Sequence, residues 1–259
     1  MSDVVRREDR AALAIVTLNR PARHNAMDDE MSDVFHGTLY AALDDPGVSA
    51  ILLRAEGKSF CSGRDTSVLG HRARAESDFH FVRRHQDSRL RMMDSTKPIV
   101  AAVKGAAIGG GCEMALACDM RISDTTLTMG LPEIDYGLLP DTGGTQLLTA
   151  LVGPSRAKYM IMSGRRIDAA TALAWGAIDL VVEPGELDAA ALELASELAA
   201  KPPINLAMAK QMIDMMHGPA IRAGTRAELL AQTALFQTAD YHEARAARRE
   251  KRAPVYKGN

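Results

Sequence analysis

The chain has 259 residues, of which 47% are hydrophobic and 25% are charged, a balance that suits one soluble domain or a domain with an appendage. Its 31 Lys and Arg residues against 33 Asp and Glu residues give a formal charge of -2, which supplies no general attraction to nucleic acid or to an anionic membrane. The N-terminus lacks the apolar stretch of a signal peptide, and every apolar run is too short to span a bilayer. We therefore expect a cytoplasmic protein.

In chain order, short apolar runs alternate with helical patterns. Residues 12–18, 49–55 and 97–105 predict strands, because they are short, rich in β-branched side chains and bounded by Gly, Pro or charge. Between the first two, residues 28–45 place apolar side chains on one face of a helix. This alternation is typical of an α/β fold.

The second half of the chain starts with a glycine-rich junction and becomes mostly helical. Three glycines in IGGGCEMALACD precede an apolar helical run, and further strand pieces, turns and helices follow as far as a strand at 177–182. From residue 186 onward nearly every residue is a good helix former, including a long stretch from 222 to 252. We expect a core domain at 1–195 and a helical C-terminal region at 196–259.

The cysteines Cys61, Cys112 and Cys118 are odd in number and lie in apolar company. This pattern favours reduced thiols over disulfides. The sequence shows no cluster of His and Cys that would complete a metal site. We therefore expect buried thiols that act as small hydrophobic side chains, and no metal ion.

The three adjacent glycines suggest that backbone without side chains is needed at a strand-to-helix junction. They do not complete a dinucleotide-binding motif, because its third glycine would fall on Met114. The first amides of a helix have no internal partner, so an end without side chains can hold a developing oxyanion. Gly63, in the turn KSFCSGRD, would aim the amide of Arg64 or of a neighbouring residue at the same point. Close packing at a tight turn explains the glycines equally well from spacing alone.

Three carboxylates lie near these glycines in the sequence. Glu113 falls in the first turn of the helix, where it suits either a general base or ordinary capping. Glu133 follows Pro132, and either donates a proton from an apolar pocket or begins a short helix. Asp141 has the pattern of an N-cap for the helix after it. Spacing alone does not bring the three together.

Six stretches, in order, closely resemble the crotonase family, which is the enoyl-CoA hydratase and isomerase superfamily. They cover residues 18–27, 58–65, 97–123, 130–148, 162–182 and 250–258. The resemblance implies a spiral of β-β-α repeats followed by a helical region that trimerises, as a homo-trimer or as a hexamer built from two trimers. It also implies an acyl-CoA thioester substrate whose carbonyl is held by the amides of Arg64 and Gly110. Arg64, Asp65, Thr66 and Ser67 would line the turn that binds coenzyme A.

The resemblance further implies a reaction. Hydratases of the family flank the substrate with two glutamates, which correspond to Glu113 and Glu133 here. The implied chemistry is syn addition of water to a trans-2-enoyl-CoA, giving a 3-hydroxyacyl-CoA. Glu113 would deprotonate the attacking water and Glu133 would protonate C2. This reaction requires no metal or redox cofactor, since coenzyme A is part of the substrate.

Asp141 departs from the straight-chain hydratases, which tend to have glycine after the proline of this loop. An acid here resembles dienoyl-CoA isomerases, whereas crotonobetainyl-CoA hydratases are similar in having all three acids. The sequence favours hydration and leaves a branched or polar substrate open. Isomerisation through Asp141 and acyl-CoA binding without turnover are the alternatives.

Two polar segments receive simpler interpretations. His71, His80 and His85 lie in a segment that we expect to be mobile, near the mouth of the pocket and without a chemical role. Residues 244–252, ARAARREKR, predict a solvated helical face. By the family resemblance, this face would also contact a phosphate of coenzyme A bound to a neighbouring subunit.

Overall fold

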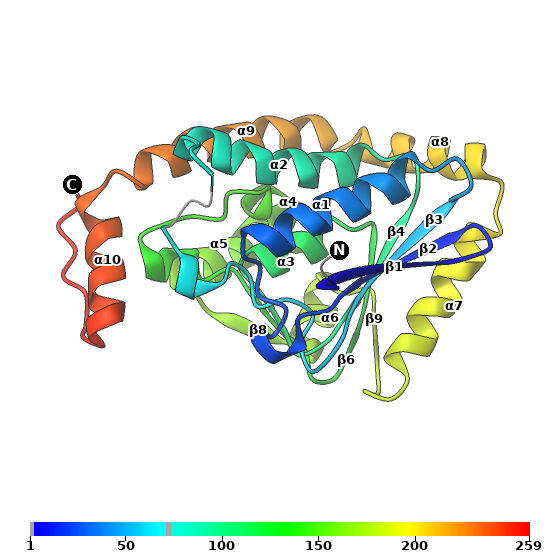
Figure 1. Cartoon of the computed structure of the whole chain (residues 1–259), viewed down its shortest axis with the longest axis horizontal. Coiled ribbons are helices and arrows are strands. Elements are labelled where there is room, and N and C mark those ends of the chain that lie inside the picture. The colour runs from blue at the N-terminus through cyan, green and yellow to red at the C-terminus, as the bar shows by residue number, and fades with distance from the viewer. Residues whose placement is uncertain (1–2, 71–73) are drawn as a thin grey trace.

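The computed structural model describes residues 3–70 and 74–259, within which two β-sheets are surrounded by helices (Figure 1). The larger sheet has the strand order β1-β2-β3-β4-β6-β9 and the smaller has the order β5-β7-β8. The strands are β1 (Val5–Arg10), β2 (Leu13–Leu18), β3 (Ala50–Ala55), β4 (Ile99–Val103), β5 (Ala106–Ile108), β6 (Met120–Asp124), β7 (Thr128–Gly130), β8 (Arg166–Asp168) and β9 (Leu180–Val182).

The helices fall into a group between the strands and a C-terminal group. The α-helices between the strands are α1 (Asp29–Asp44), α2 (Asp78–Asp94), α3 (Gly110–Leu116), α4 (Gly144–Val152), α5 (Pro154–Ser163) and α6 (Ala169–Trp175). The C-terminal helices are α7 (Leu187–Ala199), α8 (Pro203–Asp214), α9 (Gly218–Leu235) and α10 (Ala239–Glu250). Short 3-10 helices lie at η1 (Pro21–Arg23), η2 (Thr66–Val68) and η3 (Glu133–Tyr136).

The larger sheet is buried on both faces, which explains why its strands are nearly continuous apolar runs. From β2 to β9 all neighbouring strands are parallel, and only β1 pairs in the antiparallel direction. Alternate residues of β2 point to opposite faces: Val16 packs in the main core with α1 and α3, and Ile15 packs against α7. Figure 1 shows α7 on the face of the sheet opposite α1. The predicted α/β core is confirmed.

Two polar elements are among those that were not predicted from the sequence. Strand β1 has the sequence VRREDR and lies at the edge of the sheet, where only Val5 is buried. The expectation of a mobile segment around His80 and His85 is wrong, because both residues belong to helix α2. The side chain of Ser77 caps this helix by accepting a hydrogen bond from the amide of His80. His71 lies outside the described residues.

The C-terminal helices do not form a separate layer, since α9 runs alongside α2 (Figure 1). A small apolar cluster joins the two, with Phe81 of α2 packed near Leu229 and Phe236 in the α9 region. The predicted helical stretch from 222 to 252 is broken between α9 and α10, where Thr238 caps the second helix. The division into 1–195 and 196–259 stays a prediction.

Two further expectations can be compared directly with the structure. Cys61, Cys112 and Cys118 are all free and buried, as predicted, and burial raises the pKa of the Cys61 thiol to about 11. In the described ranges, no helix combines the length and the apolar character needed to cross a bilayer.

Each glycine of the strand-to-helix junction has a different structural reason. Gly109 has a φ of +55°, a left-handed conformation that side chains disfavour. A Cβ on Gly111 would lie 2.1 Å from the carbonyl oxygen of Cys61, so the backbones pack too closely for any other residue. A Cβ on Gly110 would meet nothing within 4 Å. Packing therefore explains Gly109 and Gly111 but not Gly110, where bare backbone faces open space.

The two inner glycines make a matched pair for a stability test. We expect Gly111→Ala to lower the melting temperature by roughly 5 °C or more, because overpacking a core costs about 1–3 kcal/mol and each kcal/mol shifts a domain of this size by roughly 2–4 °C. Gly110→Ala should melt close to the wild type. Thermal unfolding followed by circular dichroism measures both, and equal melting temperatures for the two variants would contradict the close packing at Gly111.

Candidate active site

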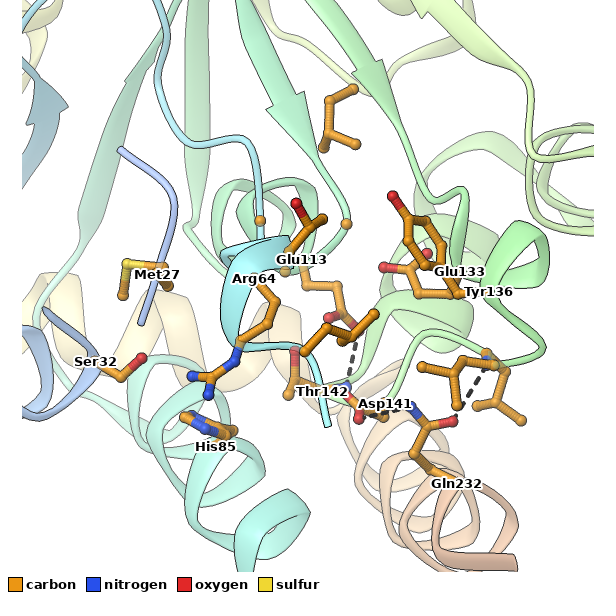
Figure 2. Close-up of a pocket in the computed structure, with 18 of the residues that line it drawn as sticks. Met27, Ser32, Arg64, His85, Glu113, Glu133, Tyr136, Asp141, Thr142 and Gln232 are labelled. Carbon is orange, nitrogen blue, oxygen red and sulfur yellow. Dashed lines mark hydrogen bonds between the residues drawn. The ribbon is translucent and has the colours of Figure 1, made fainter. Parts of the chain in front are cut away.

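A cavity of about 180 Å3 lies where the glycine junction, η3 and the loop before α4 face helices α1, α2 and α9. Every residue that the sequence analysis singled out as catalytic borders this cavity: Arg64, Gly110, Glu113, Glu133 and Asp141. They come from three separate regions of the chain, since Arg64 lies in one turn, Gly110 and Glu113 lie at the glycine junction, and Glu133 and Asp141 lie in the region before α4. Figure 2 shows Glu113, Glu133 and Asp141 around this space. The fold thus brings together side chains that spacing alone did not place.

The two turns that carry Arg64 and Gly110 lie side by side. Cys61 pairs with Ala107 in a parallel bridge, and the amide of Ile108 donates to the carbonyl oxygen of Cys61 at 3.0 Å. A Cβ on Gly63 would lie only 3.4 Å from the amide nitrogen of Gly110. Within the part of the chain that the structure describes, no acceptor takes a hydrogen bond from the amide of Arg64 or Gly110. Both amides therefore remain available at the edge of the cavity.

The turn that follows Arg64 is held by its own hydrogen bonds. Oδ1 of Asp65 accepts from the amide of Ser67 at 3.0 Å and from its hydroxyl at 2.7 Å, and Oδ2 accepts from Arg20 at 2.8 Å. Burial opposes the ionised form, but these donors outweigh it and lower the pKa of Asp65 to about 2. Thr66 borders the cavity, whereas Asp65 and Ser67 stabilise the turn.

Glu113 lies in the first turn of α3 but does not cap that helix. Its side chain reaches the start of α4, where Oε1 accepts from the amides of Thr142 at 2.8 Å and Gly144 at 3.0 Å. A Cβ on Gly144 would lie 2.7 Å from this oxygen, so glycine is required for the approach. The residue is only 2% exposed. These donors fix one carboxylate oxygen and leave the other free to meet a ligand.

Glu228 of α9 completes this arrangement and was not predicted from the sequence. Its Oε2 accepts from the amide of Gly143 at 2.7 Å, and its Oε1 accepts from the amide of Thr145 at 3.1 Å and from the Thr145 hydroxyl. Burial, followed by the charge of Glu113, raises the pKa of Glu228 to about 7. Two carboxylates from distant helices therefore share the four consecutive amides of residues 142–145, at the N-terminal end of α4.

Glu133 begins η3 and points into the cavity from the side opposite Arg64 (Figure 2). Its Oε1 lies so close to the junction that a Cβ on Gly109 would be 2.9 Å away. Burial, reinforced by the charge of Glu113, holds the pKa of Glu133 well above its usual range. The raised pKa favours the protonated form of Glu133, which suits this residue to donate a proton.

Asp141 is not an N-cap, so that interpretation is wrong; the N-cap of α4 is Gly143. The Asp141 carboxyl instead accepts a hydrogen bond from Nε2 of Gln232 at 3.0 Å, dashed in Figure 2. The amide of Leu139 in turn donates to Oε1 of Gln232 at 3.2 Å. Burial and the charges of Glu113 and Glu228 raise the pKa of Asp141 well above its usual range. The protonated form of Asp141 is thus favoured in the cavity wall, as it is for Glu133.

An acid with a raised pKa and a hydrogen-bonded carboxylate beside two free backbone amides form a cavity that suits acid and base catalysis. Residues 8–259 match the enoyl-CoA hydratase/isomerase family, and the chain belongs to that family. Within residues 3–70 and 74–259 no three His, Cys, Asp or Glu side chains are grouped to hold a metal ion.

The chain is similar to curated and solved members of this family over nearly its whole length. It is 36% identical to 2,3-dehydroadipyl-CoA hydratase from Escherichia coli over 98% of both chains. It is 35% identical to a short-chain-enoyl-CoA hydratase from Clostridium acetobutylicum, over 95% of this chain and 94% of the relative. A crystal structure of an enoyl-CoA hydratase/isomerase from Pseudoalteromonas atlantica, 28% identical, superposes with a TM-score of 0.88 over 98% of this chain and all of that one. The predicted crotonase fold is confirmed.

Glu228 should make the stability of the protein depend on pH. Its folded pKa of about 7 exceeds the ordinary value of about 4.3, so the free energy of unfolding falls as pH rises across that window, by up to about 1.4 kcal/mol per pH unit. Glu228→Gln removes this slope but costs about 1–3 kcal/mol, because an amide of α4 loses its acceptor. We therefore expect the variant to be more strongly destabilised at pH 5 than at pH 8.

Urea unfolding at the two pH values, at one protein concentration, measures this difference. Glu193→Gln serves as the control, since Glu193 is exposed on α7. The same destabilisation at both pH values would show that the Glu228 carboxyl does not titrate in this window.

Proposed function

We propose that the protein is an enoyl-CoA hydratase that adds water across the double bond of a trans-2-enoyl-CoA to give a 3-hydroxyacyl-CoA. The observation that carries this proposal is the contrast between two glutamates in one cavity. Glu113 accepts two backbone hydrogen bonds, whereas burial and the charge of Glu113 raise the pKa of Glu133 and so favour its protonated form. A base and an acid on the same cavity suit the addition of a hydroxyl group and a proton to neighbouring carbons.

In the proposed mechanism the thioester oxygen accepts hydrogen bonds from the amides of Arg64 and Gly110. These donors stabilise the negative charge that develops on this oxygen when C3 is attacked, an interaction worth about 10²- to 10³-fold in rate for each donor. The free oxygen of Glu113 takes a proton from the attacking water while Glu133 delivers its proton to C2. A proton then returns from Glu113 to Glu133, so the net change is the addition of one water.

The relatives support a coenzyme A thioester as the substrate. The two curated relatives described above act on enoyl-CoA substrates, as their names state. We therefore propose coenzyme A as part of the substrate and no further cofactor. Arg64 to Ser67 would bind it at the turn that contains η2, where Thr66 borders the cavity.

An exposed apolar face on α8 and the turn after it supports a homo-trimer, or a hexamer of two trimers. Apolar side chains along this face are 61–78% exposed, and a contiguous exposed apolar patch of this kind marks an interaction surface. They are Ile204, Met208, Met212, Ile213, Met215 and Met216. A second copy of the chain would cover this face.

A second candidate function is isomerisation, and Asp141 is the observation that favours it. Asp141 is a half-buried acid with a raised pKa, and it borders the same cavity as Glu113 and Glu133. An acid beyond the two glutamates could move a proton along the acyl chain. Binding of acyl-CoA without turnover remains a third outcome, and it makes no use of the two glutamates.

Loss of the conjugated enoyl-thioester absorbance of crotonyl-CoA tests hydration directly. We expect turnover by the wild type and a loss of about 10²-fold or more in kcat for Glu113→Gln and Glu133→Gln, since positioned acid and base catalysis each contribute on this scale. Glu193→Gln is the matched control. An inert wild type, or variants that equal it, would contradict the assignment; conversion of a 3-enoyl-CoA dependent on Asp141 would then establish isomerisation.

The pH profile of kcat/KM reports the pKa of the group that donates the proton, which we propose is Glu133. Because Glu133 must be protonated to donate, we expect activity to fall as pH rises through its pKa, which burial and the charge of Glu113 place well above the ordinary range. The charge of Glu228 also raises the pKa of Glu133. Glu228→Gln should therefore move the falling limb to lower pH. If activity falls at the same pH in the wild type and in Glu228→Gln, Glu228 does not influence the pKa of Glu133.

A further inference from the structure

A buried guanidinium without a carboxylate partner lies in the wall of the cavity. Arg89 of α2 is only 6% exposed and borders the cavity. Its polar neighbours are distant: one terminal nitrogen lies 3.4 Å from the hydroxyl of Ser88 and the other 3.5 Å from the carbonyl oxygen of Gly110. Its Nε has no hydrogen-bond partner among the described residues. A buried charge with such weak contacts is rare in folded proteins and indicates a role in binding.

Two arginines near Arg89 are instead paired with carboxylates of the chain: Arg64, which borders the cavity, and Arg84 of α2, which does not. Arg64 lies 2.6 Å from Asp29, and Arg84 lies 2.9 Å from Asp33 and also 2.9 Å from Glu76. Among the described residues, no carboxylate oxygen lies within 4.0 Å of a guanidinium nitrogen of Arg89, so Arg89 forms no ion pair there. Arg89 therefore differs from its neighbours in carrying a charge that the chain leaves unmatched.

Two buried imidazoles add to the basic character of this wall. His85 precedes Arg89 by one helical turn of α2, so both side chains lie on the same face, and Nε2 of His85 has no partner in the described chain. Burial and then the neighbouring His36 and arginines hold the pKa of His85 well below its usual range. Burial and the charges of Arg89 and Arg84 lower the pKa of His36 to about 3. Both rings are thus neutral in a positive field.

Glu113 does not supply the missing partner for Arg89. Its charge favours the protonated guanidinium, but its Oε1 is held by the amides at the start of α4. In Figure 2, His85 and Arg64 lie on one side of the cavity, and Glu133, Asp141 and Gln232 lie on the other. The cavity therefore has an acidic wall beside the reacting carbons and a separate basic wall on α2.

We propose that Arg89 and His85 form an anion-binding subsite for the acyl group, so that the preferred substrate is a trans-2-enoyl-CoA whose acyl chain ends in a carboxylate. A carboxylate would match the charge of Arg89 and accept hydrogen bonds from its guanidinium and from Nε2 of His85. A hydroxyl group would satisfy the hydrogen bonds and leave the charge unmatched. This inference rests on the proposed hydratase function, because it names the substrate class of the same site.

The test compares substrates of equal length that differ only at the end of the chain. We measure kcat/KM for 2,3-dehydroadipyl-CoA against trans-2-hexenoyl-CoA, and expect the wild type to prefer the carboxylate by 10²-fold or more. Arg89→Met should reduce this ratio to one or below, and Arg89→Lys should retain part of it because the charge remains. Arg91→Met, two residues further along α2 at a half-buried position outside the cavity, should keep the wild-type ratio.

Two outcomes would overturn the subsite. One is a wild type that prefers the methyl-ended chain, and the other is an Arg89→Met variant that loses activity equally on both substrates, which would make Arg89 a counter-ion of Glu113.

Calorimetric binding of adipyl-CoA and hexanoyl-CoA, which cannot be hydrated, separates this inference from the proposed reaction. Tighter binding of adipyl-CoA to the wild type, abolished in Arg89→Met, supports the subsite even if no substrate is turned over; equal binding refutes it.

Discussion

The arrangement of the cavity depends on how the N-terminus of α4 is satisfied. A helix leaves its first amides without internal partners, and here those amides are buried and need acceptors. Glu113 from α3 and Glu228 from α9 provide them, with two amides for each carboxylate. The same contacts therefore satisfy amides at the N-terminus of α4, fix one oxygen of the candidate base Glu113, and attach the C-terminal helix α9 to the core. Removing any one of these helices would leave buried donors or a buried carboxylate unsatisfied.

This shared helix end also determines the charges in the cavity. Positive ends of helix dipoles favour anions, and the charge of Glu113 is a cause of the raised pKa of Glu133, Asp141 and Glu228 alike. The charge of Glu113, whose carboxylate accepts from backbone donors, thus favours the protonated form of the acids around it. A site that needs a base and a neutral acid within one cavity gains both states from the position of Glu113, without a separate partner for each residue.

Periodicity and composition predicted the parts of the fold that depend on local pattern. Strands β2, β3 and β4 of the large sheet and helix α1 repeat apolar residues at the expected spacing. Strand β1 and helix α2 escaped prediction because their polar residues form an edge strand and face charged neighbours. Glu228 and Gln232 lie about 85 to 90 residues along the chain from the groups that they bind, a separation for which the sequence pattern gives no signal. The two glutamates were paired only through the family resemblance.

The structure divides catalysis and substrate choice between backbone and side chains. The amides at Arg64 and Gly110 and those at the start of α4 belong to the main chain, so substitution of a side chain does not remove them. The groups that face the rest of the cavity are instead side chains on α2 and α9, such as Arg89 and Gln232. Changes on these two helices can alter which acyl group fits while the donors for a thioester oxygen and for Glu113 stay in place. A fold built in this way suits several acyl-CoA reactions, because the polarity of the helical wall and the position of the extra acid vary independently of the backbone amides that we propose to hold the thioester.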